Sequence, residues 1–413
     1  MLDVIHSGIL VVSNVLYQPW FVPLFLVVGG LYFTFRCKFI QVRLFKESFK
    51  VITEKPSDEN GISSFGALMV STASRVGTGN IIGVATAICL GGAGAIFWMW
   101  ITAIIGGATA FVESTLAQIY KKRDKDGSSY GGPAFYMQIA LKQRWLGVIF
   151  SILVILVYAV GYNMLAAYNL QSTFEVFSFY DGSVTPKVIG IILAILFGII
   201  VIGGAKRLIK VTGVMVPVMG VIYVAVSLLV LALNIFNIPA MIAWIFKSAF
   251  DFHAIFGGFA GSCIMWGIKR GLYSNEAGMG SAPNAAAKAD ISHPAKQGLV
   301  QMLSVFLDTL LICTATAFMC LSTMTDPSAF VSDGAADAAG YVQTSMAASL
   351  GGFGPVFLTV AMCLFAFTTL IGNYSYCEGC LEFIIKRVPS RAELLIFRLI
   401  ATILVFVGAV ASA

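Results

Sequence analysis

The stretch GISSFGALMVSTASRVGTGNIIGVATAICL, residues 61–90, is apolar enough to cross a lipid bilayer, yet its centre is polar and rich in glycine. Gly77 and Gly79 weaken an α-helix there, and Arg75, Thr78 and Asn80 place polar side chains at hydrocarbon depth. Backbone that leaves a helix at this depth is tolerated only where it lines a cavity or is buried in protein. The stretch therefore predicts a broken helix within a membrane protein.

A broken helix leaves free N–H groups on one half and free C=O groups on the other. Such N–H groups suit a carboxylate, and such carbonyls suit a cation, so the break is a candidate binding site. The alternative is close helix packing, because Gly79 and Gly83 form a G-x-x-x-G pattern that is common where membrane helices cross.

The composition agrees with a membrane location. The 413 residues are 58% hydrophobic and 11% charged, whereas soluble domains carry about 25% charged residues. No soluble domain of useful size is left over, and the net charge of +6 is interpreted loop by loop rather than as affinity for nucleic acid. The first apolar segment has Asp3 and no Lys or Arg before it, so we expect a retained helix rather than a secretory signal.

Apolar runs predict ten spanning helices. They lie near 8–35, 62–90, 93–120, 146–176, 187–205, 210–236, 256–284, 296–324, 352–386 and 391–413. Of the 26 Lys and Arg, 20 fall in five loops that lie on one side if every span is real. These loops are 36–59, 120–145, 205–210, 284–297 and 386–391. The positive-inside rule makes this side cytoplasmic and places the N-terminus outside, in a cell membrane.

A second interrupted segment, RGLYSNEAGMGSAPNAAA at residues 270–287, resembles the first in kind. Gly278, Gly280 and Pro283 interrupt the helix, and Ser274 and Glu276 are among its polar groups. It lies in the seventh predicted span and the first lies in the second, so the two run in opposite directions. Paired interrupted segments of opposite direction are typical of secondary transporters with inverted repeats, whose binding site lies at the midplane.

This arrangement divides the chain, a single transmembrane domain over 1–413, into three parts. They are an extra helix at 8–35, a first repeat at 62–236 and a second repeat at 256–413. A complete second repeat needs an eleventh span, so we expect the last helix to be truncated or lost.

Charged residues within the spans are costly at bilayer depth, and they usually form pairs or face a cavity. Arg75 is expected either to form an internal gate with Glu113 or Glu276, or to be a snorkelling or structurally paired arginine. For Glu276 and Asp308 a functional role and a structural ion pair both remain open.

Six motifs resemble the alanine/glycine:cation symporter family, also called sodium:alanine symporters. They are GGAGAIFWMW (91–100), VGTGNIIGVATAI (76–88), GGPAFYM (131–137), SNEAGMGSAPNAAA (274–287), HPAKQG (293–298) and LFAFTTLIGNYSYCE (364–378). The resemblance runs from about residue 10 to 413. It implies an all-α LeuT-type fold of five-plus-five inverted repeats after one extra helix, and Na⁺-driven uptake of a small amino acid such as alanine or glycine.

The resemblance also implies a site. Residues 77–80 would be the unwound part of the first core helix, with the N–H groups of Thr78 and Gly79 taking the substrate carboxylate. Met279, beside Gly278, would cap the substrate side chain. One cation would bind Asn80, Ser274 and Asp308, whose oxygen donors suit Na⁺. A second would bind the carbonyls near Ala73 and Val76 and the hydroxyls of Thr368 and Thr369.

Span four departs from the family. Relatives commonly carry Gln-x-Asn facing the substrate, but this sequence reads Ala166-Ala167-Tyr168. Asn163, Asn169 or Tyr162 could substitute, and the identity of the small amino acid is thereby left open.

Two other classes and one other ion are alternatives. A membrane-embedded enzyme is disfavoured because no H-E-x-x-H or G-x-S-x-G motif occurs. A channel can also use paired half-helices, but it would not saturate with a co-substrate. Within transporters, H⁺ coupling through Glu276 or Asp308 stays open.

Overall fold

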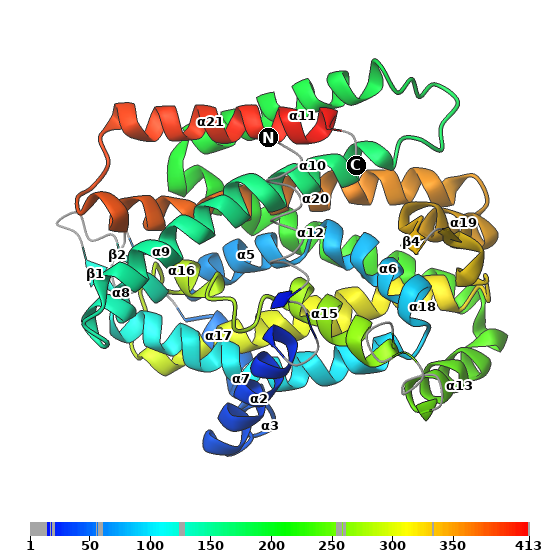
Figure 1. The fold of residues 1–413 in the computed structure, drawn as a ribbon, viewed down its shortest axis with the longest axis horizontal. Helices are drawn as coiled ribbons and strands as arrows, with labels where there is room; N and C mark the ends of the chain where they lie inside the picture. The colour runs from blue at the N-terminus through cyan, green and yellow to red at the C-terminus, as the bar shows by residue number, and fades with distance from the viewer. Residues whose placement is uncertain are drawn as a thin grey trace.

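The computed structural model describes residues 15, 16, 18, 21–54, 56, 61–123, 129–252, 258, 262–332 and 334–411. The predicted start of the first span, 8–14, lies outside these residues. Seven of the described helices are long and apolar enough to cross a membrane, and a bent pair makes up an eighth such span. The protein is therefore a multi-pass membrane protein built almost entirely of helices (Figure 1).

The first half of the chain contains α2 (Val22–Arg36), α3 (Ile40–Arg43), α4 (Phe45–Ile52), α5 (Ser64–Arg75), the 3₁₀ turn η1 (Thr78–Asn80), α6 (Ile82–Gly91), α7 (Ala95–Ile119), α8 (Pro133–Ile139), α9 (Arg144–Val154), the π-helical η2 (Ile155–Tyr162), α10 (Asn163–Ser172), α11 (Thr185–Ile202) and α12 (Gly204–Leu233). The short η3 (Ile235–Asn237) and α13 (Ile238–Ala249) follow.

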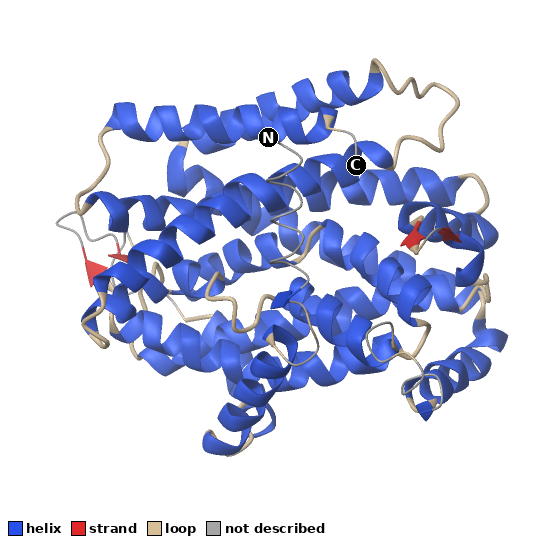
Figure 2. Cartoon of the chain, in the orientation of Figure 1, coloured by secondary structure: helices blue, strands red, loops and turns tan. Residues whose placement is uncertain are grey.

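The second half contains α15 (Cys263–Asn275), α16 (Ala282–Ala286), α17 (Pro294–Val305), the π-helical η5 (Phe306–Cys313), α18 (Thr314–Leu321), the 3₁₀ turn η6 (Pro327–Phe330), α19 (Ala338–Leu350), α20 (Phe353–Ile385) and α21 (Arg391–Val410). Two small hairpins, β1 (Lys122–Arg123) with β2 (Ser129–Tyr130) and β3 (Val331–Ser332) with β4 (Ala335–Ala336), lie at opposite ends of the molecule (Figure 2). Within the described residues, the predicted spans coincide with helices or runs of helices, whereas α3, α4, α8, α13 and α19 lie in segments predicted as loops.

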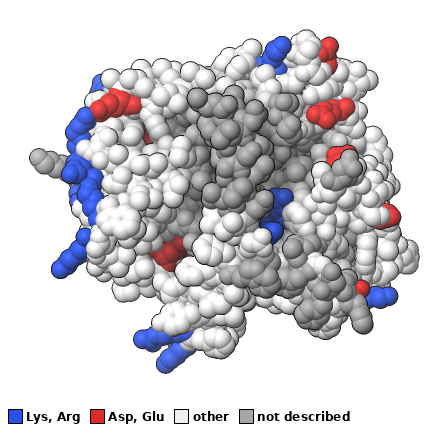
Figure 3. All heavy atoms as spheres, in the orientation of Figure 1, with Lys and Arg blue, Asp and Glu red and all other residues white. Residues whose placement is uncertain are grey.

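Both predicted breaks are present. The first broken span, predicted at 62–90, bends by 54° between α5 and α6, and the second broken span, predicted at 256–284, is unwound between α15 and α16. In Figure 1, α5 and α16 lie toward the left end and α6 and α15 toward the right, so the broken spans run in opposite directions through the centre. Basic side chains gather along the left edge, over β1, β2 and α8 (Figure 3). We call this end, which carries the five loops rich in Lys and Arg, the basic side.

The helices around the breaks form the core, and the outermost helices face lipid. In α20, 67% of the most apolar window is buried, against 22% in α21. The backbones of α20 and α5 touch at Gly372, where a Cβ atom would collide with the backbone of Ala73 and Ser74. Glycine at this position therefore allows α20 to lie directly against the first broken span.

Replacing Gly372 with alanine should therefore separate α20 from α5 and destabilise the protein by about 1–3 kcal/mol, as overpacking does. Thermal unfolding of the purified protein in detergent measures the effect. Gly379→Ala in the same helix is the control, because the nearest atom to its Cβ, the carbonyl oxygen of Gly131, is 4.0 Å away. Equal stability of the two variants would show that the close approach is unimportant.

Candidate functional site

The first break is held open by a side chain. Val76 leaves the helical region at ψ 90°, and the N–H of Gly77 donates to Oδ1 of Asn80 (2.8 Å) instead of continuing the helix. Within the described residues, nothing accepts a hydrogen bond from the N–H of Thr78 or Gly79, and nothing donates to the carbonyls of Ala73 or Val76. The break therefore presents free donors and free acceptors, as its sequence predicts.

Asp308 connects the two broken spans. Its Oδ1 accepts from Nδ2 of Asn80 (2.6 Å), and its Oδ2 accepts from the hydroxyls of Ser274 (2.8 Å) and Thr309 (2.8 Å). All four side chains are buried, and the thiol of Cys313 lies 3.2 Å from both Asn80 and Ser274. The structure thus brings together Asn80, Ser274 and Asp308, the three residues expected around one cation.

The π-helical turn explains how Asp308 reaches this position. A π turn inserts an extra residue into a helix and is frequent at functional sites. Here η5 carries Asp308, Thr309 and Cys313, and it widens the span opposite the first break. The sequence does not mark this turn, so Thr309 and Cys313 were not predicted to join the cluster.

Of the two threonines expected around a second cation, only one has a free hydroxyl in the described structure. The hydroxyl of Thr369 is buried without a partner among the described residues, and it lies directly against Gly77. The hydroxyl of Thr368 donates within its own helix, to the carbonyl of Leu364 or Phe365 (3.0 Å each), and lies 3.5 Å from the sulfur of Met219 on α12. Thr369 is therefore the residue with a free hydroxyl facing the break.

A cavity of about 20 Å³ lies between the two breaks, enough for a water molecule. It is lined by Ser74, Arg75, Gly77, Thr78, Gly79, Tyr162, Ala166, Tyr273, Ser274, Glu276, Thr369 and Asn373. The rings of Tyr162 and Tyr273 meet edge to face with centroids 5.1 Å apart, which joins span four to the second broken span. The two broken spans thus line one small central cavity.

Glu276 anchors a buried hydrogen-bond network at one wall of this cavity. The left-handed φ of Glu276 (55°) ends α15, and its carboxylate accepts from the hydroxyls of Ser74 (3.0 Å) and Ser281 (2.6 Å). Ser74 also lies 2.6 Å from Oδ1 of Asn373, whose Nδ2 donates to Asn163 (2.9 Å). The network therefore joins α5, α10 and α20 to the second break, and Ser74 and Asn373 are site residues that the sequence reasoning missed.

Three residues predicted to bind the substrate do not line the cavity. These residues are Gly278, Met279 and Asn163. Gly278 has a φ of 85°, and a Cβ on it would meet Leu26 and Thr109 rather than the cavity. Met279 lines a separate hollow between α2 and α15, and Asn163 is bonded to Asn373 behind the wall. The reason is register: the helix ends at Asn275, so Tyr273 and Glu276 face the cavity in their place.

Among the alternatives for span four, Tyr162 lines the cavity beside Ala166. Asn169 donates to the hydroxyl of Thr78 (3.2 Å), so it supports the first break.

Of the two alternatives for Arg75, the ion pair with Glu113 or Glu276 is not formed: in the described structure no carboxylate lies within 4.0 Å of this arginine. Nη1 of Arg75 donates to the side chain or carbonyl of Gln301 (3.3 Å each), and Nε and Nη2 have no partner among the described residues. Glu113 instead accepts from the N–H groups of Gly278 (3.3 Å) and Gly280 (3.2 Å). Glu113 therefore supports the unwound backbone of the second break.

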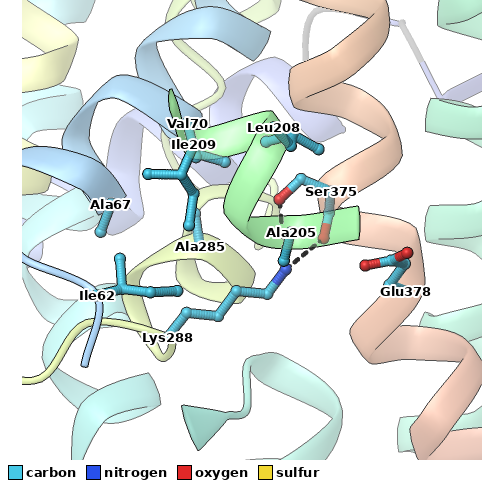
Figure 4. Close-up of a pocket in the computed structure, with 10 residues that line it drawn as sticks. All are labelled: Ile62, Ala67, Val70, Ala205, Leu208, Ile209, Ala285, Lys288, Ser375 and Glu378. Atoms are coloured by element: carbon cyan, nitrogen blue, oxygen red, sulfur yellow. Dashed lines mark hydrogen bonds between the residues drawn. The ribbon is translucent and has the colours of Figure 1, made fainter. Parts of the chain in front are cut away.

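On the basic side, the segment after α16 is fastened to its neighbours. Nζ of Lys288 donates to the carbonyl of Ser375 on α20 (2.8 Å), beside a hollow of about 10 Å³ that Glu378 also lines (Figure 4). Nζ of Lys121 donates to the carbonyl of Ala289 (2.6 Å), and burial lowers the pKa of Lys121 to about 8. These bonds hold the segment after α16 against α20 and the end of α7 on the basic side.

Known proteins resemble this chain over most of its length. A sequence profile of the sodium:alanine symporter family matches residues 2–413. The amino-acid carrier protein AlsT of Bacillus subtilis is 45% identical over 392 residues, which cover 94% of this chain and 81% of AlsT. The "Probable sodium/glutamine symporter GlnT" of the same organism is also 45% identical, over 92% of this chain and 78% of its own length.

A more distant relative and a solved structure extend the comparison. The sodium/alanine symporter AgcS of Methanococcus maripaludis is 38% identical over 97% of this chain and 87% of its own length. A Na⁺-coupled sialic acid symporter, solved substrate-bound and outward-open, superposes with a TM-score of 0.55 at 14% identity, over 95% of this chain and 81% of that one. This similarity establishes the expected LeuT-type fold. The chain therefore belongs to the sodium:alanine symporter family, whose members are Na⁺-coupled transporters and not enzymes.

Proposed function

We propose that this protein imports a small neutral amino acid, alanine or glycine, together with Na⁺ across the cell membrane by alternating access. The observation that carries the proposal is the central cavity, where free N–H groups of one broken span face a buried carboxylate of the other. A zwitterion matches this pattern of opposite charges.

In the proposed complex the substrate carboxylate binds the N–H groups of Thr78 and Gly79. The substrate ammonium lies toward Glu276, which lines the same cavity and is 3% exposed. Ala166 and Tyr162 bound the space for the side chain. The cavity has room for about one water molecule and not for an amino acid, so binding has to be accompanied by movement of its walls.

One Na⁺ would bind between the carboxylate of Asp308 and the hydroxyl of Ser274. Asn80 now turns its Nδ2 toward Asp308, so the amide has to rotate to offer Oδ1 to the ion. That rotation removes the acceptor of the N–H of Gly77. Gly77 directly precedes Thr78 and Gly79, whose N–H groups would bind the substrate. Ion and substrate are then coupled because both act on the conformation of the first break. A second Na⁺ would bind Thr369 and the carbonyls of Ala73 and Val76.

The proposed topology follows from the direction of the broken spans. Repeats at 62–236 and 256–413, after an extra helix at 8–35, would be related by inversion, with the basic side in the cytoplasm and the N-terminus outside. The opposite directions of α5–α6 and α15–α16 support this arrangement.

The function is tested with purified protein in proteoliposomes, using labelled alanine, glycine and serine under imposed Na⁺ or H⁺ gradients. We expect alanine and glycine to accumulate against their gradients when Na⁺ is high outside. Accumulation driven by a pH gradient without Na⁺ would replace Na⁺ by H⁺, with Glu276 or Asp308 as the proton acceptor. Lack of saturation and of counterflow would indicate a channel.

Asp308→Asn should raise the Na⁺ concentration for half-maximal alanine uptake by about 10- to 100-fold, since interactions with a charged group are worth about 1.5–3 kcal/mol. Thr369→Ala should raise it in the same direction by a smaller factor. Thr86→Ala is the control, because it removes a hydroxyl of the first broken span that donates only to Ile82 of its own helix (2.7 Å). Unchanged Na⁺ dependence in either test variant would exclude that residue from the ion sites.

Ala166→Val should lower kcat/KM for alanine more than for glycine, because the added methyl groups occupy the space left for the substrate side chain. A difference of about 1–3 kcal/mol, or roughly 10-fold or more, is typical of one methylene in a tight pocket. The ratio of kcat/KM for the two substrates is the measurement, since a folding defect lowers both equally. An unchanged ratio would place the side chain elsewhere.

A further inference from the structure

A long apolar groove of about 540 Å³ lies between α5, α12 and η5. Phe65, Leu68 and Val76 form its α5 wall, and Val221 and Leu228 belong to its α12 wall. Phe65, Val221 and Leu228 are 39%, 69% and 61% exposed, so the groove opens outward on the face that the bilayer covers. Gly220 also lines it, and a Cβ there would meet no atom within 4 Å.

The dimensions of the groove match one lipid chain. From Val216 to Leu228 it follows α12 for twelve residues, or about 18 Å at 1.5 Å per residue. The hydrocarbon of one leaflet is about 15 Å deep, half of a core of about 30 Å. An apolar groove of this size does not hold ordered water, because its walls offer too few polar partners.

Charge at one end of the groove selects the kind of lipid. Lys210 precedes Leu228 by 18 residues, or five helical turns, so it lies on the face of α12 that lines the groove, and it precedes Val216, where the groove begins on α12, by six residues, or about 9 Å. Lys210 is exposed and has no partner among the described residues. A lysine near the membrane surface attracts an anionic headgroup, by about 1 kcal/mol.

We propose that the groove binds an anionic phospholipid, with one acyl chain behind α5 and its phosphate on Lys210. The chain would contact Thr72 and Val76, in the last turn of α5 and next to the first break. A bound lipid would then support the outer face of this half-helix and resist its displacement into the bilayer.

The test uses the full-length protein in vesicles of phosphatidylcholine and phosphatidylglycerol at 3:1, with a phosphatidylglycerol probe that carries a diazirine in one acyl chain. Labelled residues are identified by mass spectrometry. We expect label in the groove, at Val221 and Leu228, to exceed that at the equally lipid-facing Ile192 and Ile195 of α11 (54% and 56% exposed) at least fivefold. Equal labelling of α12 and α11 would indicate only bulk lipid and overturn the proposal.

Gly220→Phe should fill the groove and reduce its labelling at least fivefold. Gly213→Phe is the matched control: it lies in the same helix, also faces open space and does not line the groove. Lys210→Gln should remove the preference for the phosphatidylglycerol probe over a phosphatidylcholine probe. The proposal would be overturned if Gly220→Phe left the labelling unchanged, or if the unmodified protein showed no preference for either headgroup. It would also be overturned if the groove stayed unlabelled because a second copy of the protein covers it. None of these readouts depends on transport.

Discussion

Unpaired backbone in the middle of a membrane is the constraint on which the rest of this structure depends. Each N–H or C=O group without a partner at that depth costs several kcal/mol, so two interrupted helices require protein around them on all sides. The oppositely directed broken spans meet this requirement together. Asn80 bonds the freed N–H of Gly77, and Glu113 accepts from the freed N–H groups of Gly278 and Gly280. The donors left over, at Thr78 and Gly79, are those that face the cavity.

The surrounding helices are built to hold these breaks in place. The close approach at Gly372 presses α20 against α5, and the π turn of η5 directs Asp308 between the two spans. Both features use backbone geometry rather than long side chains. A substrate site made in this way is shaped by helix positions, so a small rotation of one helix against another changes both its volume and its access.

The sequence predicted the breaks well because glycines and polar residues are conspicuous in an apolar span. The resemblance to sodium:alanine symporters also implied that Asn80, Ser274 and Asp308 meet, and in the structure these three residues do lie together. It failed where register decides the outcome. Glu276 ends α15 in a left-handed conformation, which sends Met279 away from the cavity and leaves Tyr273 inside it. For Arg75 the sequence left a pair with a carboxylate and a structural role both open, because charge alone does not reveal that Gln301 is within reach and the carboxylates are not.

The hydroxyl of Ser74 has one proton but lies within hydrogen-bond distance of two acceptors, the carboxylate of Glu276 and Oδ1 of Asn373. The oxygen and the nitrogen of a side-chain amide are assigned from the bonds they make, and reversing the amide of Asn373 resolves the conflict. Its nitrogen would then donate to Ser74, and the nitrogen of Asn163, which has no partner in the described structure, could donate to Asn373 once its own amide turns. All donors would then point one way, from span four through α20 and α5 to Glu276. Such an ordered chain polarises each member and ends on the negative charge, so α10 would respond to the charge state of a residue it never touches.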